Sequence, residues 1–362
     1  MLACHLQPNT ESSIVTDSGI LMNPPKKNTR NGRGVAPRVG VVITNYNNAS
    51  YVEDAIGSAS RQTIHNLHVI VVDDHSTDNS NDIIRRSLAK LNDSRFQYVR
   101  LTENGGQAAA IRKGLALLDT PFVCFLDSDD YWYDDFINRH LSVHLNSDFP
   151  VGLTYCDSHI VDEHAYLLAG TAWWFDHKLG SPSPRTIQSR FIPAIDPEAG
   201  DATFYPTNEI LLHLYWTPEW ASNSMTGMMF RRSFVDLVLK PADADLRLYV
   251  DFYLSTLAAL LTGAIAIPEA LYAYRMHGDN KHSNGMVFGG TYNTSQKPWE
   301  PIRDRVLNQV LQVLQNDSEL LRRVFGVHRH EQALASMRSA VGARGKYRSL
   351  KALNKLQKIL SR

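Results

Sequence analysis

The chain has 362 residues, enough for one large α/β domain with extensions or for two domains. Its apolar fraction of 43%, charged fraction of 20% and formal net charge of zero are ordinary for a globular protein and exclude a general polyanion binder, so we expect no nucleic-acid partner. No run of about 18 apolar residues occurs, and the polar N-terminus has no signal-peptide pattern, so no spanning helix is expected. Among the three cysteines, Cys124 and Cys156 stand in strand-like runs and are expected to be buried free thiols.

Residues 1–37 are rich in Asn, Pro, Ser, Thr and Gly and are predicted to be a disordered lead-in. Apolar β-branched runs then alternate with helically spaced segments. Strands are expected at 39–44, 67–74, 96–101 and 122–127, and helices at 50–63, with Ser50 as N-cap, 76–91 and 106–118. This order predicts an α/β fold with a doubly wound, mainly parallel sheet. Right-handed crossovers bring all four strand ends to one edge, where such sheets bind ligands.

The second half is less regular. Residues 165–222 show no clear period, whereas 225–234, the helix-like 246–261 and the strand-like 264–278 are periodic again. The last stretch, 300–362, is predicted to form successive helices.

Three acids follow the apolar run that ends the fourth predicted strand: Asp127, Asp129 and Asp130. Carboxylates this close repel one another, and one would take up a proton. A divalent cation such as Mg²⁺ or Mn²⁺ removes that conflict, because carboxylate oxygens suit hard ions. The alternative is a helix N-cap cluster, in which Asp129 or Asp130 caps a helix that begins near Trp132.

Four segments in this order resemble the nucleotide-sugar glycosyltransferases of family 2, which have the GT-A fold. They are "VGVVITNYNNASYVEDAIGSASRQT", "VIVVDDHSTDNS", "ENGGQAAAIRKGLA" and "FLDSDD". The resemblance runs from about Val39 to Ser283. It implies a GT-A (Rossmann-like) sheet, with a glycosyltransferase domain at 38–285 and a helical C-terminal extension at 286–362. Within that domain, 38–130 would bind the nucleotide and 131–285 would bind the acceptor and carry the catalytic base.

The resemblance implies a role for each matching residue. Thr44, Asn45 and Tyr46 would line the nucleobase and ribose pocket, Asp73 would accept a hydrogen bond from the base, and Asn104 and Ser128 would lie near the nucleotide-sugar. Asp127 would contact ribose or metal, and Asp129 would bind the metal. Asp74 and Asp78 would instead fix the loop that follows the second strand and cap the helix after it. Arg112 stands where the family has Asn, so it either reaches the diphosphate or is a helix-surface charge.

Inverting transfer needs a base for the acceptor hydroxyl, and the resemblance places Asp251 at that position. Val250 replaces the acid that usually precedes it. Apolar neighbours would raise the pKa of Asp251 toward a useful value; the alternative is a helix cap or a salt bridge. His277, in a segment similar to the family's Y-R-x-H-x-x-x-x-S, would be a third metal ligand or a diphosphate contact, with Arg275 and Lys281 nearby. A purely structural histidine is the alternative.

Three further features complete the set of candidates, and two of them allow two interpretations each. Arg231 and Arg232 resemble the basic end of a strand before the acceptor loop. Trp173, Trp174, Trp216 and Trp220 would form an acceptor platform or pack in the interior. The tail 343–362 has seven Lys or Arg and no acid, so it either lies on an anionic membrane or packs on the domain.

These observations predict a metal-dependent inverting glycosyltransferase that uses Mn²⁺ or Mg²⁺ and moves a single sugar, with a UDP-sugar favoured as donor. Its acceptor would be a glycan, a polysaccharide precursor or a lipid-linked molecule. A cytoplasmic location follows, with peripheral attachment to the inner face of a membrane as a variant. The alternative function is a non-catalytic nucleotide-sugar-binding subunit, which would need no base. A dehydrogenase is disfavoured, because no GxGxxG follows the first strand.

Overall fold

The computed structural model describes residues 36–170, 185–187, 192–195, 202–205, 210–217, 224–239, 247, 249–278, 280 and 299–342. These residues all belong to one compact unit, which comprises 35–362. Almost all of the predicted lead-in and the whole basic tail lie outside the described residues.

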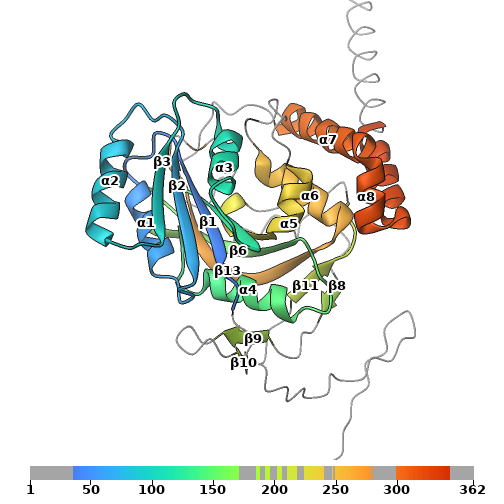
Figure 1. Ribbon diagram of the computed structural model, residues 1–362, viewed down its shortest axis with the longest axis horizontal. Helices are drawn as coiled ribbons and strands as arrows, with labels where there is room; N and C mark the ends of the chain where they lie inside the picture. Colours follow the sequence, from blue (N-terminus) through green and yellow to red (C-terminus); the bar gives the residue numbers. More distant parts are fainter. Residues whose placement is uncertain are drawn as a thin grey trace, which may run out of the picture. The chain divides into compact units, whose positions relative to one another are not determined.

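The first half of the unit follows the predicted alternation of strands and helices (Figure 1). The elements are β1 (Val39–Asn45), α1 (Val52–Ser60), β2 (Leu67–Asp73), α2 (Ser80–Leu91), β3 (Phe96–Arg100), α3 (Gln107–Leu115) and β4 (Phe122–Asp127). The four strands are parallel and lie in the order β3-β2-β1-β4. Ser50 is not the N-cap of α1. A turn in which the carbonyl of Asn48 accepts the N–H groups of Tyr51 and Val52 carries the chain past it, and Tyr51 takes the cap position.

The second half extends the sheet with strands of both directions. β12 (Met228–Arg231) is antiparallel between β4 and β6 (Leu153–Val161), and β13 (Ala264–Arg275) runs parallel to β6. The sheet continues through β11 (Ile210–His213) and β8 (Arg185–Ile187), while β5 (Tyr131–Trp132) pairs with β13, β7 (Leu167–Ala169) pairs with β6, and β9 (Ile192–Ile195) and β10 (Ala202–Tyr205) form a separate pair. Because β4, β6 and β13 share one direction, their C-terminal ends meet at the same edge.

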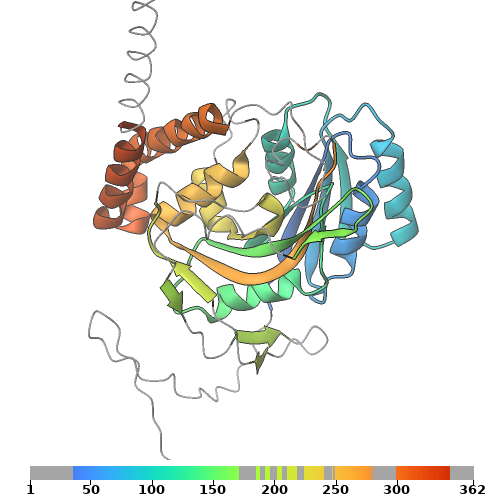
Figure 2. The same cartoon turned by 180° about the vertical axis from the view of Figure 1, so that it is seen from behind.

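Helices cover both faces of the sheet, as a doubly wound fold requires (Figures 1 and 2). One apolar core lies beneath α1, α2 and α4 (Phe136–Asn146). The other lies beneath α3, α5 (Arg232–Val238) and α6 (Val250–Leu261). The fold class predicted from the sequence is therefore confirmed. Cys124 and Cys156 are buried free thiols, also as expected.

The helical C-terminal region packs on the second core. α7 (Trp299–Asn316), α8 (Ser318–Phe325) and a helical stretch over 327–342 contribute side chains to it, and α7 contacts α6. Arg329 donates hydrogen bonds to the carbonyl oxygens of Leu214, Ala259 and Leu261, which satisfies the C-terminal end of α6. Within the described residues, no helix is both long enough and apolar enough to cross a bilayer.

Candidate active site

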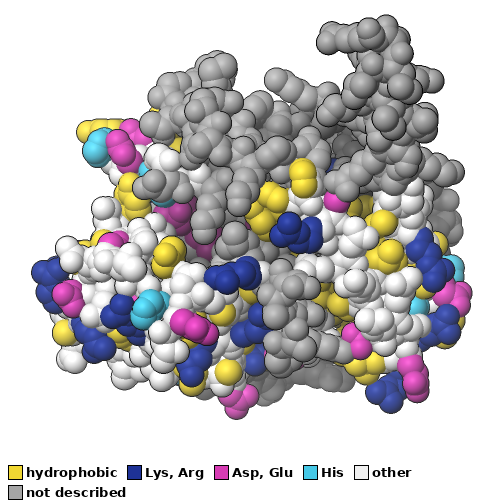
Figure 3. Space-filling view, turned by 90° about the horizontal axis from the view of Figure 1, so that it is seen from above, with side chains coloured by type: hydrophobic (Ala, Val, Ile, Leu, Met, Phe, Trp, Pro, Cys, Tyr) yellow, Lys and Arg dark blue, Asp and Glu magenta, His cyan; other side chains and the backbone are white. Residues whose placement is uncertain are grey.

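The ends of the first, second and fourth strands lie side by side, as the βαβ pattern predicts. Thr44 is in register with Asp127 across β1 and β4, and Asn45 is in register with Asp73 across β1 and β2. These side chains therefore reach the same edge of the sheet. On the face viewed from above, acidic side chains are visible in a hollow near the middle (Figure 3).

Asp73 is fully buried at the end of β2 and is surrounded by donors. The amide of Asn45 donates to its Oδ1 at 2.8 Å, and the hydroxyl of Ser76 donates to the same oxygen. Arg100, at the end of β3, pairs with its Oδ2 at 3.2 Å and also donates to the carbonyl of Ser76. This carboxylate and guanidinium form an ion pair at the predicted nucleobase position. Arg100 belongs to none of the sequence motifs, so its contact with Asp73 could not be predicted.

Asp74 holds the loop that precedes α3. Its carboxylate accepts the backbone N–H groups of Gly105 and Gly106, each at 2.8 Å, and its carbonyl accepts the amide of Asn104. Burial raises the pKa of Asp74, and the two N–H groups oppose that rise. Asp78 accepts the N–H groups of Ala49 and Ser80, the latter at the start of α2. Asp74 therefore anchors the loop before α3 and not the loop that directly follows β2. Asp78 bonds the first N–H of α2, although Asn79 takes the N-cap position.

Asp127 ends β4 and accepts two hydrogen bonds on Oδ1. Thr44 donates through its hydroxyl at 2.9 Å and Gln107, at the start of α3, through its amide at 2.8 Å. Burial, followed by the charge of Asp129, raises the pKa of Asp127 to about 7, although the two hydrogen bonds act in the opposite direction. The charge of Asp251 raises the pKa of Asp127 further, so Asp251 lies close enough to act on this carboxylate.

The next two acids have different environments. Asp129 keeps a side chain 22% exposed, and its Oδ2 lies 3.2 Å from Nε2 of His277. Asp130 is buried, accepts the hydroxyl of Thr226 at 2.7 Å and the backbone N–H of Arg275 at 2.9 Å, and joins β4 to the ends of β12 and β13. Burial, then the charges of Asp129 and Asp127, raises its pKa well above the ordinary value. The helix-cap interpretation is wrong, because a strand, β5, follows and α4 begins only at Phe136.

Arg275 stabilises the acid loop instead of offering charge to a ligand. It is 3% exposed, donates to the carbonyl of Asp129 at 3.0 Å and pairs with Asp54 at 2.7 Å. Its guanidinium also lies over the rings of Tyr51 and Tyr131, at 4.7 and 5.4 Å from their centroids. The expectation of free positive charge here does not hold for Arg275, and Lys281 lies outside the described residues.

Asp251 occupies the first turn of α6. The residue before the helix, Tyr249, has a left-handed backbone with φ 66°, so the chain turns sharply into α6. Burial raises the pKa of Asp251 to about 6, and the backbone N–H of Phe252 limits the rise. A carboxyl group with this pKa is partly ionised near neutral pH and suited to accept a proton. The apolar setting expected from the sequence is present.

Tyr274 stands beside all of these acids. Burial is the largest cause that raises its pKa well above the ordinary value, and the charges of Asp130, Asp129, Asp127 and Asp251 add to it. Its phenol therefore stays neutral. The sequence segment around His277 includes this tyrosine, but its pattern does not indicate that four carboxylates lie near enough for their charges to act on the phenol.

The donor set fits a divalent cation that is completed by a ligand's own oxygens. Asp127 and Asp129 are like-charged neighbours with raised proton affinity at Asp127, a conflict that a cation relieves. In the described part of the chain, no three His, Cys, Asp or Glu side chains are grouped so as to enclose a metal ion. Such an open arrangement matches Mg²⁺ or Mn²⁺ sites that take one or two carboxylates and phosphate oxygens.

The remaining predicted residues divide into two groups. At the site edge, Tyr46 is 41% exposed, Ser128 is buried and accepts the amide of Asn48, and Asn104 contacts Arg247. Arg112 is half-buried within α3, a turn beyond Gln107, and its role stays a prediction.

Three other candidates lie away from the acids. Arg231 is paired with Phe122 at the start of β4, so it lies at the end of the sheet opposite to the acids. It donates to the carbonyls of His144 and Val151. Arg232 follows it and pairs with Asp236. Trp216 packs in the core, and the other three predicted tryptophans lie outside the described residues.

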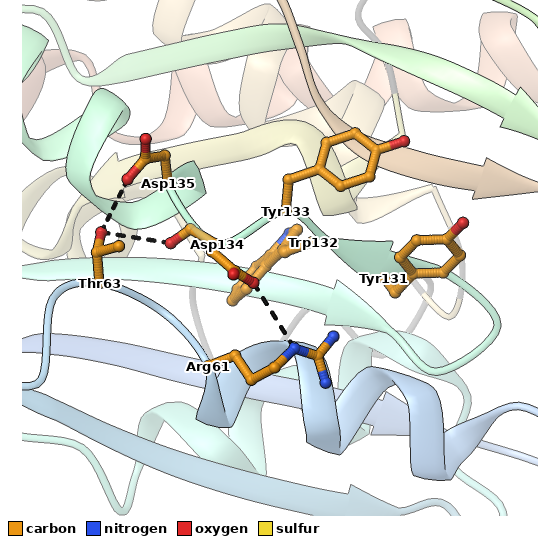
Figure 4. Close-up of a pocket in the computed structure, with 7 residues that line it drawn as sticks. All are labelled: Arg61, Thr63, Tyr131, Trp132, Tyr133, Asp134 and Asp135. Atoms are coloured by element: carbon orange, nitrogen blue, oxygen red, sulfur yellow. Dashed lines mark hydrogen bonds and ion pairs between the residues drawn. The ribbon is translucent and has the colours of Figure 1, made fainter.

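A separate pocket of about 440 Å³ contains none of the predicted site residues. Its lining residues are Arg61, Thr63, Tyr131, Trp132, Tyr133, Asp134 and Asp135 (Figure 4). Thr63 donates to Asp135 at 3.0 Å, and Arg61 pairs with Asp134 at 3.6 Å. These contacts join the end of α1 to the segment before α4, so the pocket is explained as a packing groove.

The sequence profile of Glycosyl transferase family 2 matches residues 40–239. The chain belongs to this family, as the resemblance predicted. A curated relative, an uncharacterized glycosyltransferase from Nostoc sp. (strain PCC 7120), is 27% identical over 68% of this chain and 66% of its own length. The putative teichuronic acid biosynthesis glycosyltransferase TuaG from Bacillus subtilis (strain 168) is 39% identical over 29% of this chain and 41% of its own length. The chain thus spans less than two thirds of either relative.

Solved structures with a similar course include two that were determined with a bound nucleotide-sugar. TarS 1-349 from S. aureus in complex with UDP-GlcNAc has a TM-score of 0.48 at 16% identity and covers 84% of this chain and 72% of its own. The mannosyltransferase PcManGT from Pyrobaculum calidifontis, in complex with GDP-Man and Mn²⁺, has a TM-score of 0.46 at 19% identity. Its match covers 89% of this chain and 81% of the PcManGT chain.

Proposed function

We propose that this chain is a metal-dependent, inverting glycosyltransferase that moves a single sugar from a nucleoside diphosphate donor to an acceptor hydroxyl. The observation that supports this best is the proximity of three carboxyl groups. Asp127 and Asp129 lie at the end of β4, and Asp251, in the first turn of α6, is close enough for its charge to raise the pKa of Asp127. Two of these carboxyl groups have raised pKa values, about 7 and about 6, from two halves of the chain. Family membership supports the same reaction class.

In the proposed mechanism, Asp251 is the base. The acceptor oxygen attacks the anomeric carbon while Asp251 takes the hydroxyl proton. The bond from that carbon to the phosphate oxygen breaks, and its electron pair leaves with the nucleoside diphosphate. Attack from the face opposite to the leaving group inverts the configuration. Holding both reactants at one sheet edge supplies the alignment.

Asp129 and Asp127 are the residues that would hold the cation. A bound Mn²⁺ or Mg²⁺ supplies positive charge that stabilises the departing diphosphate. His277 lies 3.2 Å from Asp129, so it either adds a ligand or orients that carboxylate. Asp130 and Arg275 fix the backbone of this segment, and Thr44 and Gln107 orient Asp127.

The Asp73–Arg100 pair supports a uridine nucleotide. The family resemblance puts Asp73 where the carboxylate accepts a hydrogen bond from the base, often a uracil imide, and Arg100 holds that carboxylate from the end of β3. Asn45 holds the carboxylate from one side, and Tyr46 is exposed nearby at the end of β1. We therefore favour a UDP-sugar as donor.

For the acceptor, we propose a glycan, a polysaccharide precursor or a lipid-linked sugar. The name of the TuaG relative refers to teichuronic acid biosynthesis, which supports an acceptor in polymer assembly. Contact of the tail 343–362 with the inner face of a membrane remains a proposal, because the tail lies outside the described residues.

The test is release of UDP from UDP-glucose, UDP-N-acetylglucosamine and a matched GDP-mannose control, with Mn²⁺ and with water as acceptor. Water as attacking group needs the same base, so no acceptor has to be known. We expect release from at least one UDP-sugar, and a loss of about 10²- to 10⁴-fold in Asp251→Asn, the range for a general base. If the wild type binds UDP-sugars but releases no UDP, and Asp251→Asn binds them with the same affinity, the non-catalytic binding subunit is favoured.

A further inference from the structure

Arg247 contacts the loop that precedes α3, although 143 positions separate it from that loop in sequence. Its Nη2 donates to both the carbonyl and the side-chain Oδ1 of Asn104, each at 3.0 Å. Asn104 in turn donates to the carbonyl of Asp74. The guanidinium therefore joins a chain of hydrogen bonds that begins at the end of β2.

The backbone of Arg247 contacts the same loop. Its carbonyl accepts the N–H of Ala108 at 3.1 Å, in the first turn of α3. Gly106 lies against it, with φ 82°, and a Cβ there would be 2.8 Å from that carbonyl oxygen. This close approach requires glycine. Side chain and backbone of Arg247 together clamp loop 104–106, defined here as Asn104, Gly105 and Gly106.

Asp251 lies four residues beyond this clamp. Between them, Tyr249 has the left-handed backbone at φ 66°. A tyrosine keeps that conformation only where contacts on both sides hold it. Arg247 supplies the contacts on one side and α6 on the other, so the place where α6 begins depends on the clamp.

We propose that Arg247 is a positioning residue that couples occupancy of the nucleotide site to the placement of Asp251. This inference rests on the proposed function, because it takes loop 104–106 as part of the donor site and Asp251 as the base. A nucleotide that orders loop 104–106 orders the start of α6 through Arg247. Donor binding therefore steadies Asp251 in the position that it already has near Asp127, which keeps the base aligned with the bound donor.

Amide hydrogen exchange tests this coupling without a known acceptor. UDP with Mn²⁺ is added to the full chain, and exchange is followed in peptides that cover 104–110 and 249–257. In the wild type, we expect slower exchange in both. In Arg247→Ala, we expect slower exchange in 104–110 only. Arg61→Ala, which removes an exposed arginine paired with Asp134, is the matched control and should behave like the wild type.

Kinetics separate positioning from simple structural support. For UDP-sugar hydrolysis, we expect Arg247→Ala to lower kcat about 10- to 100-fold, as a small misplacement of a reacting group does, and to change KM less than about threefold. In the Asp251→Asn background, the same substitution should cause no further loss. An equal loss in both backgrounds, or a change confined to KM, would overturn the coupling.

The exchange outcomes also distinguish this inference from the proposed function. Protection of 104–110 without 249–257 in the wild type, or of both peptides in Arg247→Ala, overturns the inference alone. No protection of 104–110 by UDP, and none by GDP tested in parallel, overturns the nucleotide site and with it the inference.

Discussion

Replacing Asp127 by Asn should stabilise the metal-free protein while it weakens the site. Asn keeps a side-chain oxygen that accepts the hydroxyl of Thr44 and the amide of Gln107, so the hydrogen bonds at 2.9 and 2.8 Å are retained. What disappears is a negative charge that is half-buried next to Asp129. Sites of this kind hold like charges for function at the expense of stability.

The size of the effect follows from the pKa of Asp127. It rises from an ordinary 3.8 to about 7 on folding, so the folded protein binds the proton more tightly than the unfolded chain. Stability is therefore lost as pH increases from about 4 to about 7, and the loss is complete above that range. Converted entirely into free energy of unfolding, this change in pKa corresponds to about 4 kcal/mol. Because the carboxyl group of Asp127 is partly exposed and so partly screened by solvent, we expect a loss of about 2 kcal/mol.

The assay is chemical unfolding in EDTA at pH 4.5 and pH 8. Asp127→Asn should exceed the wild type by about 2 kcal/mol at pH 8 and by a few tenths at pH 4.5. Asp134→Asn, at an exposed carboxylate paired with Arg61, is the matched control and should change little at either pH. A gain for Asp127→Asn that is absent, or equal at both pH values, would refute the charge-repulsion argument.

Three further predictions follow from the site and the core. The kcat/KM of UDP-sugar hydrolysis should fall about tenfold per pH unit below about 6, where Asp251 becomes protonated, and a profile flat from pH 5 to 8 would contradict its role as base. His144 donates to the carbonyl of Met229 and burial lowers its pKa to about 3, so this group alone should remove about 2 kcal/mol of stability as pH falls from 6.5 to 4.5. His144→Gln should lack that contribution when its unfolding titration is compared with the wild type, and an identical pH slope would rule it out. Gly106→Ala should cost about 1–3 kcal/mol of stability and weaken UDP binding in calorimetry, because its φ is 82° and the clamp carbonyl is too close, whereas unaltered UDP affinity would separate the loop from the donor site.

The first half of the sheet could be predicted because its signals are local. Buried parallel strands read as continuous apolar runs, such as Val39–Asn45, and the crossover rule then fixes where their ends meet. That reasoning places Thr44, Asp73 and Asp127 together, and the strand registers agree. The place of Asp78 at the start of α2 followed from the same pattern, whereas the contact of Asp74 with the loop before α3 did not.

The second half could not be predicted in the same way, because its arrangement depends on contacts distant in sequence. β12 enters the sheet antiparallel between β4 and β6, which reverses its direction and carries Arg231 to the end opposite the acids. A short apolar run carries no mark of its direction. The expectation for Arg231 and Arg232 failed for this reason.

The contacts of Arg275 and Arg247 had no local signal either. Arg275 pairs with Asp54 across 221 positions, and its burial turns an expected ligand contact into a structural one. Arg247 lies in the stretch 246–261 that the sequence marks as helix-like, but it precedes α6 and contacts Asn104, 143 positions away. Among the three acids after β4, the sequence likewise could not separate buried Asp130 from the more exposed Asp129.

The most direct measurement is calorimetric titration of the full chain with UDP, in Mn²⁺ and in EDTA, beside Asp129→Asn. If the acids at the end of β4 hold a cation against a diphosphate, UDP binds with Mn²⁺, binds at least about tenfold more weakly in EDTA, and shows the same weak binding in the variant with Mn²⁺, since a tenfold change corresponds to loss of about 1.4 kcal/mol. Equal UDP affinity under all three conditions would contradict the account.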